Sequence, residues 1–168
     1  MKTNVKNSMK TDFRKDTEKR KMYVTREFAG TVDRVWQAWT EPELLDQWWA
    51  PKPWKAVTKR MNFTNGGEWL YYMQGPEGER SYAKATYSNI APKKSFDMID
   101  AFCDENGKEN PDMPGMQWKN IFKQGGAGCI VEVEINFPSA EAMEQIIQMG
   151  FQEGFGAAHE NLDKLLAK

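Results

Sequence analysis

The sequence is poor in the residues that metal centres and disulfide scaffolds need. In 168 residues it has two cysteines, Cys103 and Cys129, and one histidine, His159. Two cysteines so far apart make neither a disulfide framework nor a zinc knuckle. A single histidine excludes every catalytic design that uses several. We therefore expect no metal and no cofactor, and we expect both thiols to be small apolar side chains of the core.

Long hydrophobic runs and an excess of one charge are also missing. No apolar stretch approaches the roughly 20 residues of a membrane helix, and no apolar N-terminal region has the form of a secretory signal. The formal net charge is −1, from 23 basic and 24 acidic side chains, which does not indicate a nucleic-acid binder. The sequence thus predicts a cytoplasmic protein with no membrane insertion and no nucleic-acid partner.

Aromatic side chains are plentiful: they are 12% of the residues, and seven are tryptophans. The length and the 40% apolar content fit one domain with a hydrophobic core. Residues 1–19 differ from the rest, because the segment 2–21 holds eight basic and three acidic side chains. We expect 1–19 to be a flexible basic leader and 20–168 to be a single domain.

Turn residues divide the middle of the chain into strands. Apolar alternation between these turns predicts strands at 22–28, 55–63, 67–74, 82–90, 95–103, 116–123 and 128–137. Capping and helical periodicity predict short helices at 32–39 and 43–49, and a helical region at 139–167 that breaks near Gly150. Short connections favour antiparallel pairing. We therefore predict an α+β fold in which a curved seven-stranded antiparallel sheet wraps around the long C-terminal helix.

Several segments match a known family in order and spacing. They are 26–28, 35–43, 47–51, 65–69, 89–92 and 150–162. With them, residues 20–167 resemble the helix-grip fold of the START/Bet v 1-like (SRPBCC) superfamily, and within it the family named after the activator of heat shock protein 90 ATPase. The resemblance implies a deep, largely apolar cavity between sheet and long helix, which superfamily members use to hold lipids, sterols, hormones or polyketides. Stimulation of a chaperone ATPase belongs to longer relatives with an additional N-terminal domain.

Strand phase and the aromatic clusters supply candidate residues for such a cavity. Trp36 and Trp39 are expected to anchor the two short helices instead. The candidates are Trp49, Trp54, Trp69, Tyr71, Met98, Asp100, Trp118, Asn120, Phe151, Phe155 and His159. No catalytic residue is assigned among them.

Two polar candidates lie on apolar strand faces, where an unpaired polar side chain is costly. Asp100 and Asn120 either point into a wet cavity and bind a ligand's polar group, or hydrogen-bond each other or the backbone, or a β-bulge shifts the phase of their strands. His159 is either a general acid or base or a histidine at the solvent edge of its helix. Gly154 and Gly156 interrupt that helix, where each costs about 1 kcal/mol relative to alanine, and we expect close approach to the sheet or a loop to be the reason.

Three functions compete. The first, which we prefer, is non-enzymatic binding of a small hydrophobic or amphipathic molecule by a monomer or homodimer. The second is a co-chaperone-like interaction with a protein partner. The third is a cyclase, dehydratase or hydrolase acting on an aromatic or polyketide-like substrate. The first requires that large side chains such as Trp69 and Trp118 leave the cavity open.

Overall fold

The computed structural model describes residues 10–113 and 115–168. Within them one antiparallel sheet of eight strands and four helices form a helix-grip fold. In chain order the elements are β1 (Asp12–Asp16), β2 (Lys21–Phe28), α2 (Val32–Thr40), α3 (Pro42–Trp48), β3 (Lys55–Met61), β4 (Glu68–Gln74), β5 (Arg80–Ala91), β6 (Ser95–Cys103), β7 (Met116–Gln124), β8 (Cys129–Asn136), α4 (Ala140–Gln148) and α5 (Phe151–Leu166).

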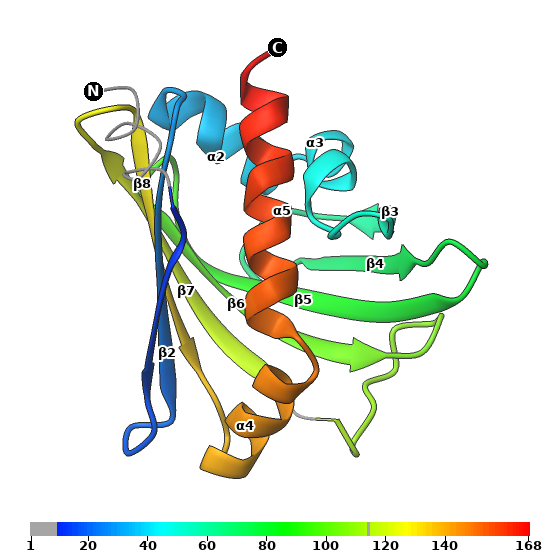
Figure 1. The fold of residues 1–168 in the computed structure, drawn as a ribbon. Helices are drawn as coiled ribbons and strands as arrows, with labels where there is room; N and C mark the ends of the chain where they lie inside the picture. Colours follow the sequence, from blue (N-terminus) through cyan, green and yellow to red (C-terminus); the bar gives the residue numbers. More distant parts are fainter. Residues whose placement is uncertain (1–9, 114) are drawn as a thin grey trace.

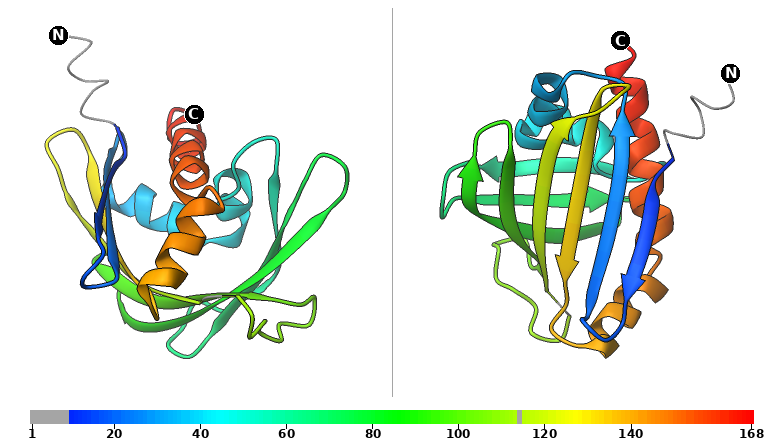
Figure 2. Two further views of the ribbon diagram at one scale, coloured as in Figure 1. Left: turned by 60° about the horizontal axis from the view of Figure 1, so that its bottom comes forward. Right: turned by 90° about the vertical axis from the view of Figure 1, so that its left-hand side faces the viewer.

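The sheet curls into a trough that holds the helices. Its strand order is β1-β2-β8-β7-β6-β5-β4-β3. Strand β2, near the start of the chain, therefore pairs with β8, the last strand. Helix α5 stands across the concave face (Figure 1), and in the left view of Figure 2 the sheet bends around it from both sides. Helices α2 and α3 lie at one end of α5 and α4 at the other (Figure 1). None of the described helices has the length and apolar character needed to cross a membrane.

Local signals explain where the helices begin and end. The hydroxyl of Thr31 accepts a hydrogen bond from the backbone N–H of Arg34 at the start of α2, and Ser139 caps α4 in the same way. Pro42 occupies the first turn of α3, where a missing N–H costs nothing. Gly150 separates α4 from α5 with φ of +93°, a left-handed conformation that glycine adopts without strain.

The expected leader contains an eighth strand, which corrects the prediction of seven strands and of a flexible segment up to residue 19. Strand β1 pairs antiparallel with β2, from Asp12 opposite Thr25 to Asp16 opposite Lys21. The residues around it also reach the helices: Thr11 Oγ1 lies 2.8 Å from His159 Nδ1, and Lys15 Nζ lies 3.1 Å from Glu144 Oε2. Residues 1–9 lie outside the described residues.

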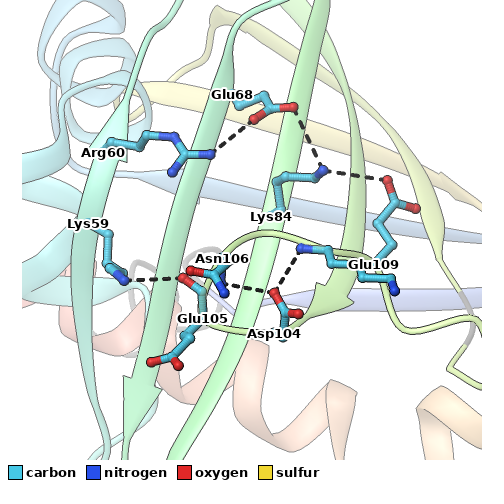
Figure 3. A network of polar contacts seen from close by, with 9 residues as sticks. Lys59, Arg60, Glu68, Lys84, Asp104, Glu105, Asn106 and Glu109 are labelled. Atoms are coloured by element: carbon cyan, nitrogen blue, oxygen red, sulfur yellow. Dashed lines mark hydrogen bonds and ion pairs between the residues drawn. The ribbon is translucent and has the colours of Figure 1, made fainter.

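The face of the sheet that is turned away from α5 carries a polar network that fixes the β6–β7 connection (Figure 3). Lys84 on β5 lies 3.7 Å from both Glu68 on β4 and Glu109 in the connection. Lys59 on β3 donates to the backbone carbonyl of Glu105. The side chain of Asp104 accepts backbone N–H groups at the start of the connection. These contacts tie the connection to the outer face, away from the concave side.

Candidate functional site

One part of the trough is filled by aromatic side chains. Trp36 of α2 makes edge-to-face contacts with Phe63, Phe96 and Phe122, with ring centroids 5.0–5.9 Å apart. Phe63 also packs edge-on against Tyr87 at 4.8 Å. Such pairs stabilise a core beyond the area they bury. The space beneath α2 is therefore core, and an opening has to lie elsewhere along the sheet.

Small residues on β5 leave room farther along the concave face. Ala83 lies between Tyr71 on β4 and Phe102 on β6 in the strand register. Two residues on, Ala85 lies between Trp69 and Asp100. Because side chains two apart share one face of a strand, β5 forms a shallow floor between taller neighbours.

A pocket of about 240 Å³ lies over this floor, beneath α4 and the first turns of α5. We call it the sheet–helix pocket. Its walls come from the end of α3, from strands β4 to β7, and from both C-terminal helices. The lining residues are Trp49, Pro51, Tyr71, Met73, Ser81, Ala83, Asp100, Ala101, Phe102, Met116, Trp118, Ile146, Met149, Gly150, Phe151, Gly154 and Phe155.

One wall of the sheet–helix pocket is a connected group of aromatic rings. Trp118 contacts Phe155 at 5.4 Å and Phe151 at 5.9 Å between ring centroids, both edge-to-face. Trp49 joins the group through Phe155 at 5.8 Å and Trp118 at 6.0 Å. The indole N–H of Trp49 donates to the hydroxyl oxygen of Tyr71 over 3.1 Å, which fixes the two rings relative to each other.

Asp100 is the one charged residue in the lining of the sheet–helix pocket. It is half-buried, and its Oδ1 is fully buried and has no hydrogen-bond partner among the described residues. Burial raises the pKa of this carboxyl to about 7, because the charged form loses hydration. Burial, and next the charge of Asp100, raise the pKa of Tyr71 well above its usual range. Tyr71 thus stays a neutral phenol, whereas Asp100 changes its charge near neutral pH.

Comparison with protein families decides where the chain belongs. A family model described as "Activator of Hsp90 ATPase homolog 1-like protein" matches residues 29–167. The chain belongs to this AHSA1 family. A comparison with curated proteins gives no match.

Solved structures agree with the AHSA1 assignment. Protein Ms6760 from Mycobacterium smegmatis is 31% identical, with a TM-score of 0.86 over 93% of this chain and 96% of that one. A protein from Arthrobacter aurescens is 29% identical, with a TM-score of 0.87 over 93% of this chain and 91% of that one. A third, from Staphylococcus epidermidis, is 30% identical and has a TM-score of 0.81, covering 92% of this chain and 93% of that one. The likeness therefore spans nearly the whole length of each protein.

In this AHSA1 member the pocket brings together six of the eleven candidates predicted from sequence. They are Trp49, Tyr71, Asp100, Trp118, Phe151 and Phe155. The other five lie outside the lining of this pocket. Trp69 stacks on Tyr71 at 4.0 Å and donates its indole N–H to Thr58, behind the wall. Met98 is a buried core residue, and Trp54 packs against the core from the loop before β3.

The remaining two candidates outside the lining are polar residues. Asn120 is fully buried; its side-chain N–H group points to the backbone carbonyl of Phe96 at 3.5 Å, and its Oδ1 has no partner among the described residues. His159 is 1% exposed and packs against the rings of Phe28 and Phe155. Its pKa falls to about 3, first through burial and then through the charge of Arg26. It is a neutral core histidine rather than a solvent-edge one.

Sequence reasoning missed the small residues that make the pocket hollow. Ser81 and Ala83 on β5 carry no chemical signal of their own, and Gly154 stands out in the sequence only for its cost to the helix. The expected close approach does not explain Gly154, because an added Cβ would meet only Pro51 Cγ at 3.6 Å, an ordinary contact. Its missing side chain instead leaves space in the pocket that it lines.

The side chains that commonly bind metal ions are scattered in the described structure. The described residues contain no group of three or more His, Cys, Asp or Glu side chains that could hold a metal ion. Cys103 is half-buried and Cys129 is buried, and burial raises the pKa of both thiols. Neither is activated as a thiolate.

Proposed function

We propose that the protein binds a small amphipathic molecule in the sheet–helix pocket, with the apolar body against the aromatic wall and a polar group at Asp100. The observation that carries this proposal is the unpartnered Asp100 Oδ1 in a mostly apolar lining, whose other polar groups are neutral: Ser81, the Tyr71 hydroxyl and the indole N–H groups of Trp49 and Trp118. A buried acceptor without a partner costs free energy. A ligand that donates a hydrogen bond to this carboxyl group removes that cost, and a polar group in an apolar pocket is typical of a binding site.

The size of the pocket limits the ligand. Its volume is about 240 Å³, and a cavity of roughly 150 Å³ is enough for benzene. A single aromatic ring with a short chain, on the order of ten heavy atoms, therefore fits by this comparison. A sterol or a long acyl chain would need the helices to move apart.

A protein partner, which the family name suggests, has less support on this surface. Large exposed apolar side chains in the described part of the chain are Ile99, at 49% exposure, and Met149, at 53%. Ile99 points to the outer face of β6, whereas Met149 lies at the end of α4 beside the pocket. Two separate side chains do not form the contiguous apolar patch of several hundred Å² that marks a docking surface.

Catalysis of a proton transfer is a second candidate function. Asp100, with a pKa of about 7, is poised as a general acid or base at neutral pH. Tyr71 offers a neutral hydroxyl in the same pocket, held by Trp49. Two groups whose environments push their pKa values apart are typical of acid–base pairs. Such an enzyme would lose turnover in Asp100→Asn while still binding its substrate.

The binding proposal is tested by native mass spectrometry of the purified protein, which detects a co-purifying small molecule, and by titration with probes. The probes are 3-phenylpropylamine, 3-phenylpropanol and 3-phenylpropanoate, which share one shape and differ in charge. Quenching of tryptophan fluorescence reports binding, because Trp49 and Trp118 line the pocket. We expect saturable binding of at least one probe.

A filled pocket provides the control. Gly154→Leu places a side chain into the pocket and should abolish binding. Glu153→Leu adds the same side chain at the adjacent, exposed position, and should leave binding intact. Equal affinities of these two variants, or no saturable binding and no co-purifying molecule in the wild type, would contradict the proposal.

A further inference from the structure

We infer that the sheet–helix pocket selects a cationic ligand, an aryl-alkyl amine in chemical class, whose ammonium group pairs with Asp100 and lies against the aromatic wall. This inference rests on the proposed function, because it names the ligand class of the same pocket. Three observations carry it: the sign of the charge in the lining, the type of polar atom that lacks a partner, and the nature of the walls.

The charge that the lining can carry is negative and has no counter-charge. Asp100 is its one charged residue, and Lys, Arg and His do not contribute to it. The nearest lysine on β5, Lys84, points to the outer face and pairs there with Glu68 and Glu109. A carboxylate ligand would meet repulsion from Asp100 with no cation to offset it, whereas an ammonium group supplies the missing counter-charge.

Two buried atoms of the lining residues lack a partner in the described structure: Asp100 Oδ1, which accepts hydrogen bonds, and Trp118 Nε1, which donates them. The one that can carry a charge is the acceptor. An ionised carboxylate only accepts hydrogen bonds, and an ammonium group brings three donors. The aromatic wall adds to this preference, because the faces of Trp, Tyr and Phe rings attract cations, most strongly where water is excluded. Trp49, Tyr71, Trp118 and Phe155 line the same pocket as Asp100, so that both interactions are available to one amine.

Binding of a cation must be linked to the ionisation of Asp100. The titratable groups whose charge interacts with this carboxyl are Tyr71 on β4, Tyr87 on β5 and Cys103 at the end of β6. All three remain neutral at neutral pH, since their pKa values are raised. The lining of β7, α4 and α5 contains no titratable side chain. Asp100 is therefore the group whose proton leaves when the amine enters.

The test compares the three phenylpropyl probes at about pH 6 and about pH 8. With the pKa of Asp100 at about 7, the ionised fraction rises about tenfold over this range, and the affinity for the amine should rise by the same factor. The affinity for the alcohol should not rise. Titration calorimetry in two buffers of different ionisation enthalpy should show release of a proton from the protein on binding of the amine.

Asp100→Asn keeps the shape and removes the charge. We expect this variant to lower the affinity for the amine by on the order of 30-fold at pH 8, as truncation of a buried charge pair does. Its affinity for the alcohol should change little. The control is Asp97→Asn on the opposite face of the same strand, where Asp97 bonds Asn89 at the surface. The affinities of Asp97→Asn for the amine and the alcohol should equal those of the wild type.

The outcomes distinguish a failure of the cation preference from a failure of ligand binding by the pocket. Equal binding of amine and alcohol, or an Asp100→Asn variant that weakens both alike, refutes the cation preference and leaves the pocket a binder of neutral ligands. An affinity for the amine that falls with rising pH also refutes it. Failure of all three probes, with no effect of Gly154→Leu, overturns the proposed function and this inference together.

Discussion

The sharpest prediction concerns the stability of the free protein as a function of pH. In the folded state Asp100 holds its proton up to about pH 7, whereas in the unfolded chain an aspartate ionises near pH 3.9. Between these values the folded protein binds one proton more than the unfolded chain. The contribution of Asp100 to the free energy of unfolding therefore falls as pH rises, by about 1.4 kcal/mol per pH unit, and levels off above pH 7.

Asp100→Asn cannot lose that proton. The difference in unfolding free energy, variant minus wild type, should therefore grow by about 3 kcal/mol between about pH 5 and about pH 8. Urea denaturation of both proteins, followed by tryptophan fluorescence, measures this difference at each pH. Other titrating groups are common to both proteins and cancel in the subtraction.

Asp97→Asn is the control, since its carboxylate is exposed and paired with Asn89, and its profile should run parallel to that of the wild type. A constant difference between Asp100→Asn and wild type, within about 0.5 kcal/mol, would refute the reasoning. It would mean that water in the pocket solvates the Asp100 carboxylate well enough to keep its pKa ordinary.

Three further predictions concern the helices and their contacts. Gly154→Ala should raise stability by up to about 1 kcal/mol, seen as a thermal midpoint about 2–4 °C higher, since the new methyl meets only Pro51 at 3.6 Å; a lower midpoint would contradict this. His159→Gln should raise the free energy of unfolding relative to that of the wild type as pH falls below 6.5, because the folded histidine stays neutral down to a pKa of about 3. The contribution of His159 to the stability of the wild type falls by about 1.4 kcal/mol per pH unit in this range. Asp163→Asn leaves the 4%-exposed Arg26 without its counter-charge, and should cost about 2 kcal/mol in urea denaturation, less than a fully buried pair because Asp163 is 39% exposed. Arg26→Met, which removes the charge itself, should cost less than Asp163→Asn.

Strand positions followed from the sequence because turn chemistry and apolar alternation act locally. Asn65-Gly66-Gly67 and Gly125-Gly126 mark connections that the structure places between strands. Strand β1 was not predicted from the sequence, because its five residues, Asp12–Asp16, are mostly charged and show no apolar alternation. Its extended form comes from pairing with the edge of β2, which is a tertiary effect that outweighs local preference.

The sequence predicts which side chains face the concave side of the sheet, but not where on that side the pocket lies. Alternation indicates which side chains face inward, and it placed Trp118 and Asp100 on the concave face. It does not indicate which part of the face stays hollow, because that depends on side-chain volumes summed across several strands. Ala83 between Tyr71 and Phe102 makes the hollow, and this neighbour relation exists only in the folded sheet. Burial of His159 likewise depends on Thr11, which lies 148 residues away.

The pairing of β2 with β8 has a consequence for synthesis of the chain on the ribosome. Phe28 and Cys129 face each other in this pair, so β2 must wait for about 100 further residues before its partner exists. At about 5–20 residues per second, this delay is on the order of 5–20 s. During it one edge of β2 lies open, while β1 already pairs with the other. The early β1–β2 hairpin therefore halves the unpaired backbone that the nascent chain presents to other chains.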